Sequence, residues 1–365
     1  MIIRTEDIKK MCSSIIKALD NIPGVLINDL LEICTENNYL FINITNREYF
    51  VTEKFFIGSD IADFRIVIRA EEFLKLIPQF TTETVALSIK DESLCVEGDG
   101  KYYFPIIYDD DKIIELPKIE IENVTEEFDI SSNTLQSISN VNAREIAKFK
   151  AISAIQKYYY IDNDGAITFT SGACINNFNL GCNIKFLLTD KIVRLFKLFN
   201  NDKVHIKFGH DSMDEVIQTK IRFEDSNTIL TAIITDDVDK MSQIPVTSIR
   251  NRATKTYNYS IEINKDSLIK AINRLSLFNT SDDVKINLIF LNDKLIIENS
   301  QKSKEIINYT SNVENLDKYA AKVYLIDLKY ALDNSKDMFI TMSFGDHETF
   351  VISRSHIINI IPECD

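Results

Sequence analysis

Glycine and proline are scarce in this sequence of 365 residues, which contains only 9 Gly and 6 Pro. Such a low content disfavours glycine-rich nucleotide-binding loops, and it also disfavours collagen-like repeats and low-complexity linkers. What remains is the composition of a folded protein, because hydrophobic residues make up 45% of the chain and charged residues 26%. At about 100–200 residues per domain, the length predicts two or three domains.

Positive charge is also in short supply. The chain has 41 Lys and Arg against 55 Asp and Glu, which gives a formal net charge of −14 and an isoelectric point near 4.9. An ordinary DNA-binding domain has a basic excess, so the overall charge argues against that class. This argument concerns total charge only, and the distribution of the basic residues is a separate question.

Long apolar runs and targeting signals are missing as well. No run approaches the roughly 20 apolar residues of a membrane-spanning helix, and the first residues lack a signal-peptide pattern. The cysteines are scattered, which predicts reduced, buried thiols in a cytoplasmic protein without membrane contact. They are Cys12, Cys34, Cys95, Cys174, Cys182 and Cys364.

Catalytic and metal-binding motifs are absent too. The four histidines form no HExxH motif, and no pair of cysteines has the spacing of a zinc site. There is no G-x-S-x-G, and the Gly-containing turns are not followed by the pattern of a P-loop or a calcium loop. The sequence therefore predicts a protein that is not an enzyme and that holds neither a metal nor a cofactor.

A unit of one helix followed by one strand recurs three times. It occupies 68–77 with 85–89, 190–199 with 204–209, and 324–332 with 340–345. An amphipathic helix precedes each unit, at 5–19, 132–146 and 265–278, and a hairpin lies between the two helices of each third. The connectors at about 108–124 and 236–256 are acidic. The pattern predicts an α+β fold with three tandem domains, 1–122, 123–252 and 253–365, each with two helices and mostly antiparallel sheet.

Four segments of this repeat carry a family resemblance. They are Phe73-Leu-Lys-Leu-Ile-Pro78, the segment from Leu94 to Phe104, the segment from Asn264 to Asn279 that contains Arg-Leu-Ser-Leu-Phe-Asn, and Ile360-Ile-Pro362 near the chain end. In their order and spacing they resemble the bacterial-type DNA polymerase sliding clamp, the beta subunit of the replicase. The resemblance covers the whole chain in register, at low identity.

The resemblance implies a DNA-clamp fold that closes into a ring. Two copies would assemble head to tail around double-stranded DNA, contact it without regard to sequence, and tether the replicative DNA polymerase after a clamp loader has placed the ring. A homodimer of this kind serves processivity in DNA replication and has no chemistry of its own. Two alternatives stay open: a scaffold of the same fold that binds proteins and does not encircle DNA, and an origin in a bacterium or in a phage.

The distribution of basic residues fits this interpretation. Lys191, Arg194 and Lys197 recur every three residues opposite an apolar face, and a helix that faces phosphates needs such a stripe. The alternative is that these side chains only solvate a helix surface. The further candidates for DNA contact are Lys10, Lys17, Lys75, Lys148, Lys150, Lys270 and Arg274.

The resemblance also implies two protein-binding regions. For ring closure, Phe104 and Ile106 of one subunit would face Leu277 and Phe278 of the other, and Pro105 suits an edge strand; the alternative is that these residues belong to the core. A pocket for a partner peptide would be built from Ile155, Thr170, Gly172, Ile175, Met241, Ile244, Ile360, Ile361 and Pro362. The chain ends in Glu-Cys-Asp, which departs from the family pattern, so the accepted peptide is expected to differ from the common bacterial one.

Overall fold

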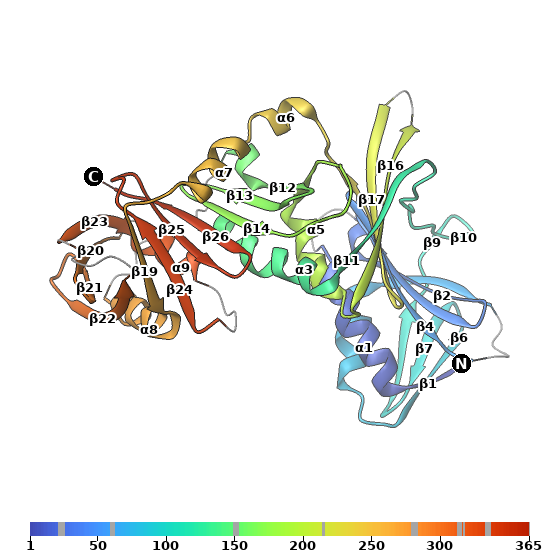
Figure 1. Ribbon diagram of the computed structural model, residues 1–365. Helices are drawn as coiled ribbons and strands as arrows, with labels where there is room; N and C mark the ends of the chain where they lie inside the picture. The colour runs from blue at the N-terminus through green and yellow to red at the C-terminus, as the bar shows by residue number, and fades with distance from the viewer. Residues whose placement is uncertain are drawn as a thin grey trace. The chain divides into compact units, whose positions relative to one another are not determined.

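The computed structural model (Figure 1) describes residues 1–20, 26–58, 63–148, 153–213, 216–278, 284–311, 316, 318–332 and 337–364. The chain divides into two compact units. The first comprises Met1–Leu135 and Lys191–Thr235, and the second comprises Gln136–Asp190 and Asp236–Asp365. Each unit is described by itself below.

The first unit contains two antiparallel sheets and a short hairpin among its described residues. The four-stranded sheet has the order β1 (Ile2–Arg4), β6 (Thr84–Lys90), β7 (Ser93–Glu97) and β8 (Lys101–Pro105). The eight-stranded sheet has the order β11 (Val124–Ser131), β16 (Lys203–Met213), β17 (Val216–Glu224), β18 (Thr228–Ile234), β4 (Tyr49–Phe56), β3 (Tyr39–Thr45), β2 (Leu30–Glu36) and β5 (Arg65–Arg69). The hairpin pairs β9 (Tyr108–Asp109) with β10 (Lys112–Ile113).

Helices α1 (Thr5–Ile15), α2 (Ala70–Leu76) and α5 (Asp190–Arg194) confirm the predicted repeat, although each of them is shorter than predicted. Helix α1 packs its buried stripe against β3 and β4, and it ends in a 3-10 turn from Ile16 to Ala18. Helix α2 begins after β5, because Ile68 and Arg69 belong to that strand. Helix α5 continues as a 3-10 turn from Leu195 to Leu198.

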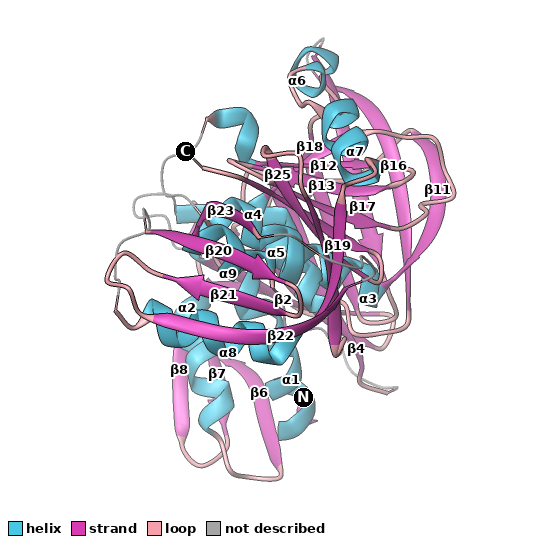
Figure 2. Cartoon of the chain, turned by 60° about the vertical axis from the view of Figure 1, so that its left-hand side comes forward, coloured by secondary structure: helices cyan, strands magenta, loops and turns pink. Residues whose placement is uncertain are grey.

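The second unit is built on one long antiparallel sheet. Its order is β15 (Phe186–Thr189), β12 (Tyr158–Asp162), β13 (Gly165–Phe169), β14 (Ala173–Asn177), β26 (Ile357–Pro362), β25 (Thr349–Arg354), β24 (Phe339–Phe344), β19 (Tyr259–Asn264), β22 (Lys304–Ser311), β21 (Lys294–Glu298), β20 (Lys285–Leu291) and β23 (Tyr319–Tyr324). Helices α8 (Lys265–Ser276) and α9 (Leu325–Ala331) pack together and cover the part from β19 to β25 (Figures 1 and 2).

Two segments of the chain differ from the predicted pattern. The single helix expected over 132–146 consists of α3 (Ser132–Ser137), a π-helical turn from Ile138 to Asn142, and α4 (Ala143–Ala147). A π turn inserts an extra residue into the helix, which explains why the apolar periodicity is weak there. The acidic connector expected over 236–256 carries helices α6 (Val238–Ser242) and α7 (Val246–Thr254).

The strand order confirms a threefold repeat at the level of topology. Each third contributes two four-stranded blocks: β1-β6-β7-β8 and β5-β2-β3-β4, then β11-β16-β17-β18 and β15-β12-β13-β14, then β19-β24-β25-β26 and β23-β20-β21-β22. Blocks of successive thirds are joined where β4 pairs with β18 and where β14 pairs with β26. The middle third contributes one block to each compact unit, so the two units do not coincide with three domains. The boundaries 1–122, 123–252 and 253–365 stay a prediction.

The described cysteines form no disulfide. Cys12, Cys95 and Cys174 are buried, whereas Cys34, Cys182 and Cys364 are only half-buried. Burial raises the pKa of the Cys174 thiol to about 12 and that of Cys34 to about 11, so both remain protonated at neutral pH. Within the described part of the chain, no helix has the length and apolar character needed to cross a membrane.

Candidate DNA-facing residues, partner pockets and sheet edges

The predicted basic stripe lies on one face of α5 and the 3-10 turn that follows it. Ile192, Leu195 and Phe196 are buried on the opposite face, while Arg194 and Lys197 are exposed. The Nζ of Lys191 lies 3.0 Å from Glu48 Oε1 and 3.1 Å from Asp20 Oδ2, and these contacts raise its pKa, the hydrogen bond to Glu48 most. Lys191 therefore already neutralises acidic groups of its own unit, and Arg194 and Lys197 are the more accessible members of the stripe.

The other basic candidates that the structure describes on helices are all exposed, but their partners differ. Lys75 forms a 2.5 Å contact with Glu71 one turn earlier in α2. Arg274 in α8 makes a bidentate pair with Glu305, with both contacts at 2.6 Å, and its hydrogen bond to this carboxylate raises its pKa. The remaining exposed candidates are Lys10, Lys17 and Lys270. Lys150 lies outside the described residues.

Lys148 is a correction to the sequence prediction. Its side chain is buried, and its Nζ lies 2.7 Å from Glu145 Oε2 and 3.2 Å from Asp327 Oδ1. The two carboxylates raise the pKa of Lys148 against the opposing effect of burial. An ammonium enclosed in this way is not on a surface that a phosphate reaches, so Lys148 is structural in this conformation.

Some of the residues predicted for a partner pocket line a cavity of about 190 Å³ in the second unit. It brings together four of the predicted residues: Thr170 and Gly172 in the turn between β13 and β14, and Ile360 and Pro362 in β26. Gly172 permits this close approach, because a Cβ there would lie 2.1 Å from the carbonyl oxygen of Ile360. The turn and the end of β26 therefore form one wall.

Four other predicted residues lie in the apolar cluster that adjoins this cavity. They are Ile155, Ile175, Met241 and Ile244. Ile361 is a second correction: it is buried in the core of β19 to β25 with α8 and α9, away from this cluster. The reason is the alternation of side chains along β26, which sends Ile360 to one face and Ile361 to the other.

Sequence reasoning missed the opposite wall of the cavity, which is formed by α7. Pro245, Ser248, Ile249 and Arg252 line it there. The spacing of Ile249 and Arg252 fits one helical face, but helix α7 lies in the segment 236–256, for which the sequence predicts an acidic connector. Phe169, Ser171, Ala173 and Thr349 complete the lining.

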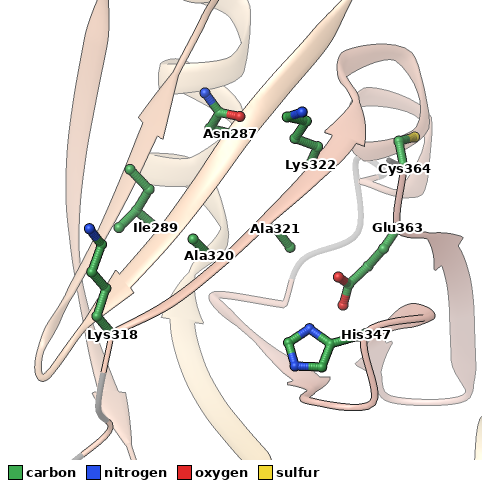
Figure 3. A pocket seen from close by; sticks show the side chains of 9 residues that line it. All are labelled: Asn287, Ile289, Lys318, Ala320, Ala321, Lys322, His347, Glu363 and Cys364. Atoms are coloured by element: carbon green, nitrogen blue, oxygen red, sulfur yellow. The ribbon is translucent and has the colours of Figure 1, made fainter.

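A second, larger cavity of about 420 Å³ borders the same chain end (Figure 3). Thr349 and Pro362 line the first cavity, whereas His347, Glu363 and Cys364 line the second. The Glu363 carboxylate points toward the His347 ring (Figure 3) and accepts a 2.5 Å hydrogen bond from the Tyr319 hydroxyl. Burial raises the pKa of Glu363.

Basic groups stand on the other side of this second cavity. Lys318 and Lys322 flank it, together with Asn287, Ile289, Ala320 and Ala321. The arrangement can bind an extended segment whose apolar part contacts the alanines and Ile289 and whose acidic part meets the lysines.

Two of the unpaired sheet edges among the described residues lie on β8 and β22. β8 is the last strand of its sheet, and the first half of β22 pairs only with β21, since β19 pairs with Tyr309–Ser311 alone. Leu277 and Phe278, just after α8, are 80% and 57% exposed. Ile306 in β22 is 62% exposed. Unpaired edges with exposed apolar side chains are unusual unless something covers them.

Phe104 and Ile106 are corrected by the structure. Both are buried in their own unit, and the Phe104 ring lies 5.5 Å from that of Phe73 in an edge-to-face contact. The exposed aromatic side chains of β8 are Tyr102 and Tyr103. Alternation along the strand places Phe104 inward, so an interface on β8 would use its backbone edge and the tyrosines.

The described residues contain no group of three or more His, Cys, Asp or Glu side chains placed to hold a metal ion. Two of the four histidines lie on β16, where His205 contacts Asp129 and His210 contacts Thr219. Both contacts are local to the sheet.

Comparison with known proteins shows which solved structures share this fold. No protein-family model and no curated protein matches the chain. Solved structures match over its whole length: the sliding clamp (DNA polymerase III subunit beta) of Pseudomonas aeruginosa bound to griselimycin, with a TM-score of 0.80, 12% identity and 99% of that chain covered; the beta subunit of Thermotoga maritima, with 0.78, 11% and 98%; and that of Borrelia burgdorferi in complex with a natural product, with 0.77, 16% and 98%. The chain has the fold of the bacterial DNA polymerase III beta sliding clamps from end to end, with a sequence far diverged from theirs.

Proposed function

We propose that this protein is a DNA sliding clamp, a processivity factor that encircles double-stranded DNA as a head-to-tail homodimer and tethers a DNA polymerase in the cytoplasm. The observation that carries the proposal is the unmatched pair of sheet edges. Within one chain, β18 pairs with β4 and β26 pairs with β14. The equivalent third pair in the repeat is β8 with β22; within one chain β8 is an edge strand, and the first half of β22 pairs only with β21.

Two copies would satisfy these edges reciprocally. β8 of each subunit would pair with β22 of the other, and the exposed Leu277, Phe278 and Ile306 would be covered by the neighbouring β8 and its tyrosines. A head-to-tail interface that uses two different surfaces closes into a ring only when the rotation between copies allows it. At each internal junction the last strands of two four-stranded blocks pair, and β8 and β22 are likewise the last strands of their blocks. We therefore infer that the third junction resembles the two internal ones and that the ring closes.

DNA contact is assigned to the exposed basic residues of the helices. Arg194 and Lys197 are the principal candidates, with Lys10, Lys17 and Lys270 as further ones; Lys191, Lys75 and Arg274 contribute charge while paired with acids of the chain. Such contacts would be to phosphates and independent of sequence, as sliding requires. The acidic total charge then belongs to surfaces away from DNA, where it discourages unspecific binding.

Partners are assigned to the two cavities at the chain end. An apolar side chain of a polymerase or clamp-loader peptide would enter the cavity between α7 and Gly172, and the peptide would continue toward Lys318 and Lys322. Apolar anchors in a preformed groove are the usual basis of such recognition. The lysines favour a peptide that carries acidic residues beside its apolar anchor.

Topological binding is the test of this function. Subunits are dissociated by dilution, concentrated again with a nicked circular plasmid, and passed over a sizing column in about 0.5 M salt, which screens electrostatic binding. We expect protein to remain with the circular DNA and to leave it after the plasmid is cut once. A Leu277→Asp, Phe278→Asp double variant serves as the control that cannot close.

The second candidate is a protein-binding scaffold of the same fold, which the net charge of −14 favours. It predicts that no protein co-elutes with the circular plasmid at high salt, while the dimer and peptide binding persist. Retention that survives linearisation would contradict the clamp as well, because a closed ring slides off open ends.

A further inference from the structure

A polar pocket of about 280 Å³ in the first unit brings two of the candidates for DNA contact, Lys10 and Lys17, together with a buried carboxylate that the function proposed above does not use. It lies between α1 and the turn that joins β17 to β18, and β4 contributes to its wall. Among the described residues, its charged lining consists of three lysines and three acids: Lys10, Lys17, Lys54, Asp7, Asp225 and Glu53.

Glu53 is the unusual member of this lining. Only 5% of the residue is exposed, and its Oε1 accepts hydrogen bonds from the Ser14 hydroxyl at 2.8 Å and the Thr228 hydroxyl at 3.0 Å. It forms no ion pair with any described residue, although most buried carboxylates have a cationic partner. Burial raises its pKa to about 7, nearby Asp225 adds to this, and Lys17 and the two hydroxyls oppose it.

Lys10 in α1 and Lys17 in the 3-10 turn that follows it also lack an ion-pair partner among the described residues. By contrast, Lys54 contacts Glu224 at 3.4 Å and Asp7 is held by Arg4. Asp225 accepts backbone hydrogen bonds from Asn227 and Thr228 within its own turn. The free positive charge of the pocket is therefore concentrated on Lys10 and Lys17.

The protonation state of Glu53 decides the charge balance. With Glu53 ionised, the three lysines and three acids of the lining cancel; with Glu53 protonated, one positive charge is in excess. An anion held by Lys10 and Lys17 would in turn disfavour the Glu53 carboxylate, since it would oppose the stabilising field of Lys17. Anion binding and proton uptake must then favour each other reciprocally.

We propose that this pocket binds a phosphate group through Lys10 and Lys17, and that binding is coupled to protonation of Glu53. The phosphate can come from a DNA backbone or from a free phosphodiester, and only the DNA source rests on the proposed clamp function. Ser13 of α1 adds a hydroxyl group to the same wall, while the Ser14 hydroxyl donates to Glu53. On DNA, the pocket makes the hold of the ring tighter at mildly acidic pH and looser at alkaline pH.

The test compares two probes whose phosphates each keep a single negative charge between about pH 6 and about pH 8.5. These two pH values lie on either side of the Glu53 titration. Dimethyl phosphate is titrated by NMR, and a short DNA duplex is titrated by fluorescence anisotropy at low salt. For the wild-type protein we expect about fivefold tighter binding at the lower pH, the effect of one unit charge at close range. Glu53→Gln should bind at the higher pH as the wild type does at the lower one, without pH dependence.

Control variants separate the pocket from other titrating groups. The Lys10→Ala, Lys17→Ala double variant should weaken dimethyl phosphate binding at both pH values, while Glu72→Gln, on the exposed face of α2, should keep the wild-type profile. A Glu53→Gln protein with the wild-type pH profile, or unchanged dimethyl phosphate binding in the double lysine variant, overturns the proposal. Dimethyl phosphate binding without a matching duplex effect supports the pocket and assigns it to a free phosphodiester.

The clamp function fails on a different result, the loss of salt-resistant retention on circular DNA. Binding of dimethyl phosphate needs neither ring closure nor a plasmid, so the two failures are distinguishable.

Discussion

The Nζ of Lys148 lies 3.2 Å from Oδ1 of Asp327, which joins the segment after α4 to helix α9 through a buried ion pair. Glu145 Oε2 contacts the same Nζ at 2.7 Å. The two carboxylates also bind the turn of the partner cavity, since Thr170 donates to Glu145 at 2.6 Å and Ser171 donates to Asp327 at 3.2 Å. One lysine thus supports both a helix junction and a cavity wall.

Replacing this lysine is expected to destabilise the protein strongly. Lys148→Met leaves two buried carboxylates without a cation, and the loss of one partner from a buried ion pair costs about 3–5 kcal/mol. Urea unfolding followed by circular dichroism measures the change in unfolding free energy. Lys157→Met, at an exposed position, is the matched control and should shift the midpoint little.

The stability of the first unit should depend on pH through Glu53. Its pKa rises from an ordinary value near 4.5 to about 7 on folding, so the folded state holds a proton that the unfolded state releases between these values. The unfolding free energy of the wild type should therefore fall as the pH rises from about 4.5 to about 7 and then level off. Glu53→Gln removes this loss, which amounts to about 3 kcal/mol at alkaline pH.

Thermal unfolding at several pH values checks this. The sign is opposite to that of an acid stabilised by an ion pair, because burial here favours the neutral form. A wild type that gains stability between pH 5 and 7 relative to Glu53→Gln would contradict the assignment.

The basic stripe should respond unevenly to substitution. Arg194→Ala with Lys197→Ala removes two exposed charges and should lower affinity for a duplex and flatten its dependence on salt. Lys191→Ala should lower DNA affinity less, because this ammonium is already shared between Glu48 and Asp20. Anisotropy titrations over a salt series measure both effects, and Lys112→Ala with Lys118→Ala is the control on an acidic connector. Equal losses in the stripe and in the control would refute the assignment.

Ring closure should be sensitive to charge on the β22 edge. Ile306→Asp places a carboxylate on a residue that is 62% exposed in the single chain, so the fold should persist while pairing with a second copy is weakened. Sedimentation velocity should show monomer at concentrations where the wild type is a dimer. Lys294→Asp, on neighbouring β21, controls for added negative charge. A wild type that stays monomeric at every concentration would remove the basis of the ring.

Periodicity and turn signals carried most of the fold prediction. The stripe Ile8, Met11, Cys12 and Ile15 predicts the buried face of α1, and the hairpin at Asn163-Asp-Gly165 joins β12 to β13 as expected. These features are local, so the sequence contains them. The π turn at Ile138–Asn142 and helix α7 were missed because an inserted residue and an acidic flank obscure the helical period.

The site was less predictable than the fold, because the errors among the predicted site residues concern the direction in which a side chain faces. Lys148 and Arg194 are both basic residues of helical segments, yet one is buried by a carboxylate more than 170 positions away in the chain and the other is exposed. Phe104 and Tyr103 differ by one step along β8, and the step decides which is core. Only tertiary contacts determine which of these side chains are buried. Gly172 and Pro362, which line the cavity, were predicted because the family resemblance covers a whole turn and the end of a strand.

The block order has a consequence for how such a ring would open. The β4–β18 and β14–β26 junctions join parts of one chain, so their effective concentration is fixed by the covalent connection and does not fall on dilution. A junction between β8 and β22 of two chains has no such tether, and its occupancy follows the protein concentration. In the proposed ring, one of every three equivalent junctions is therefore formed between two chains. A protein assembly that opens the ring would have to separate only this junction, whose occupancy already falls on dilution.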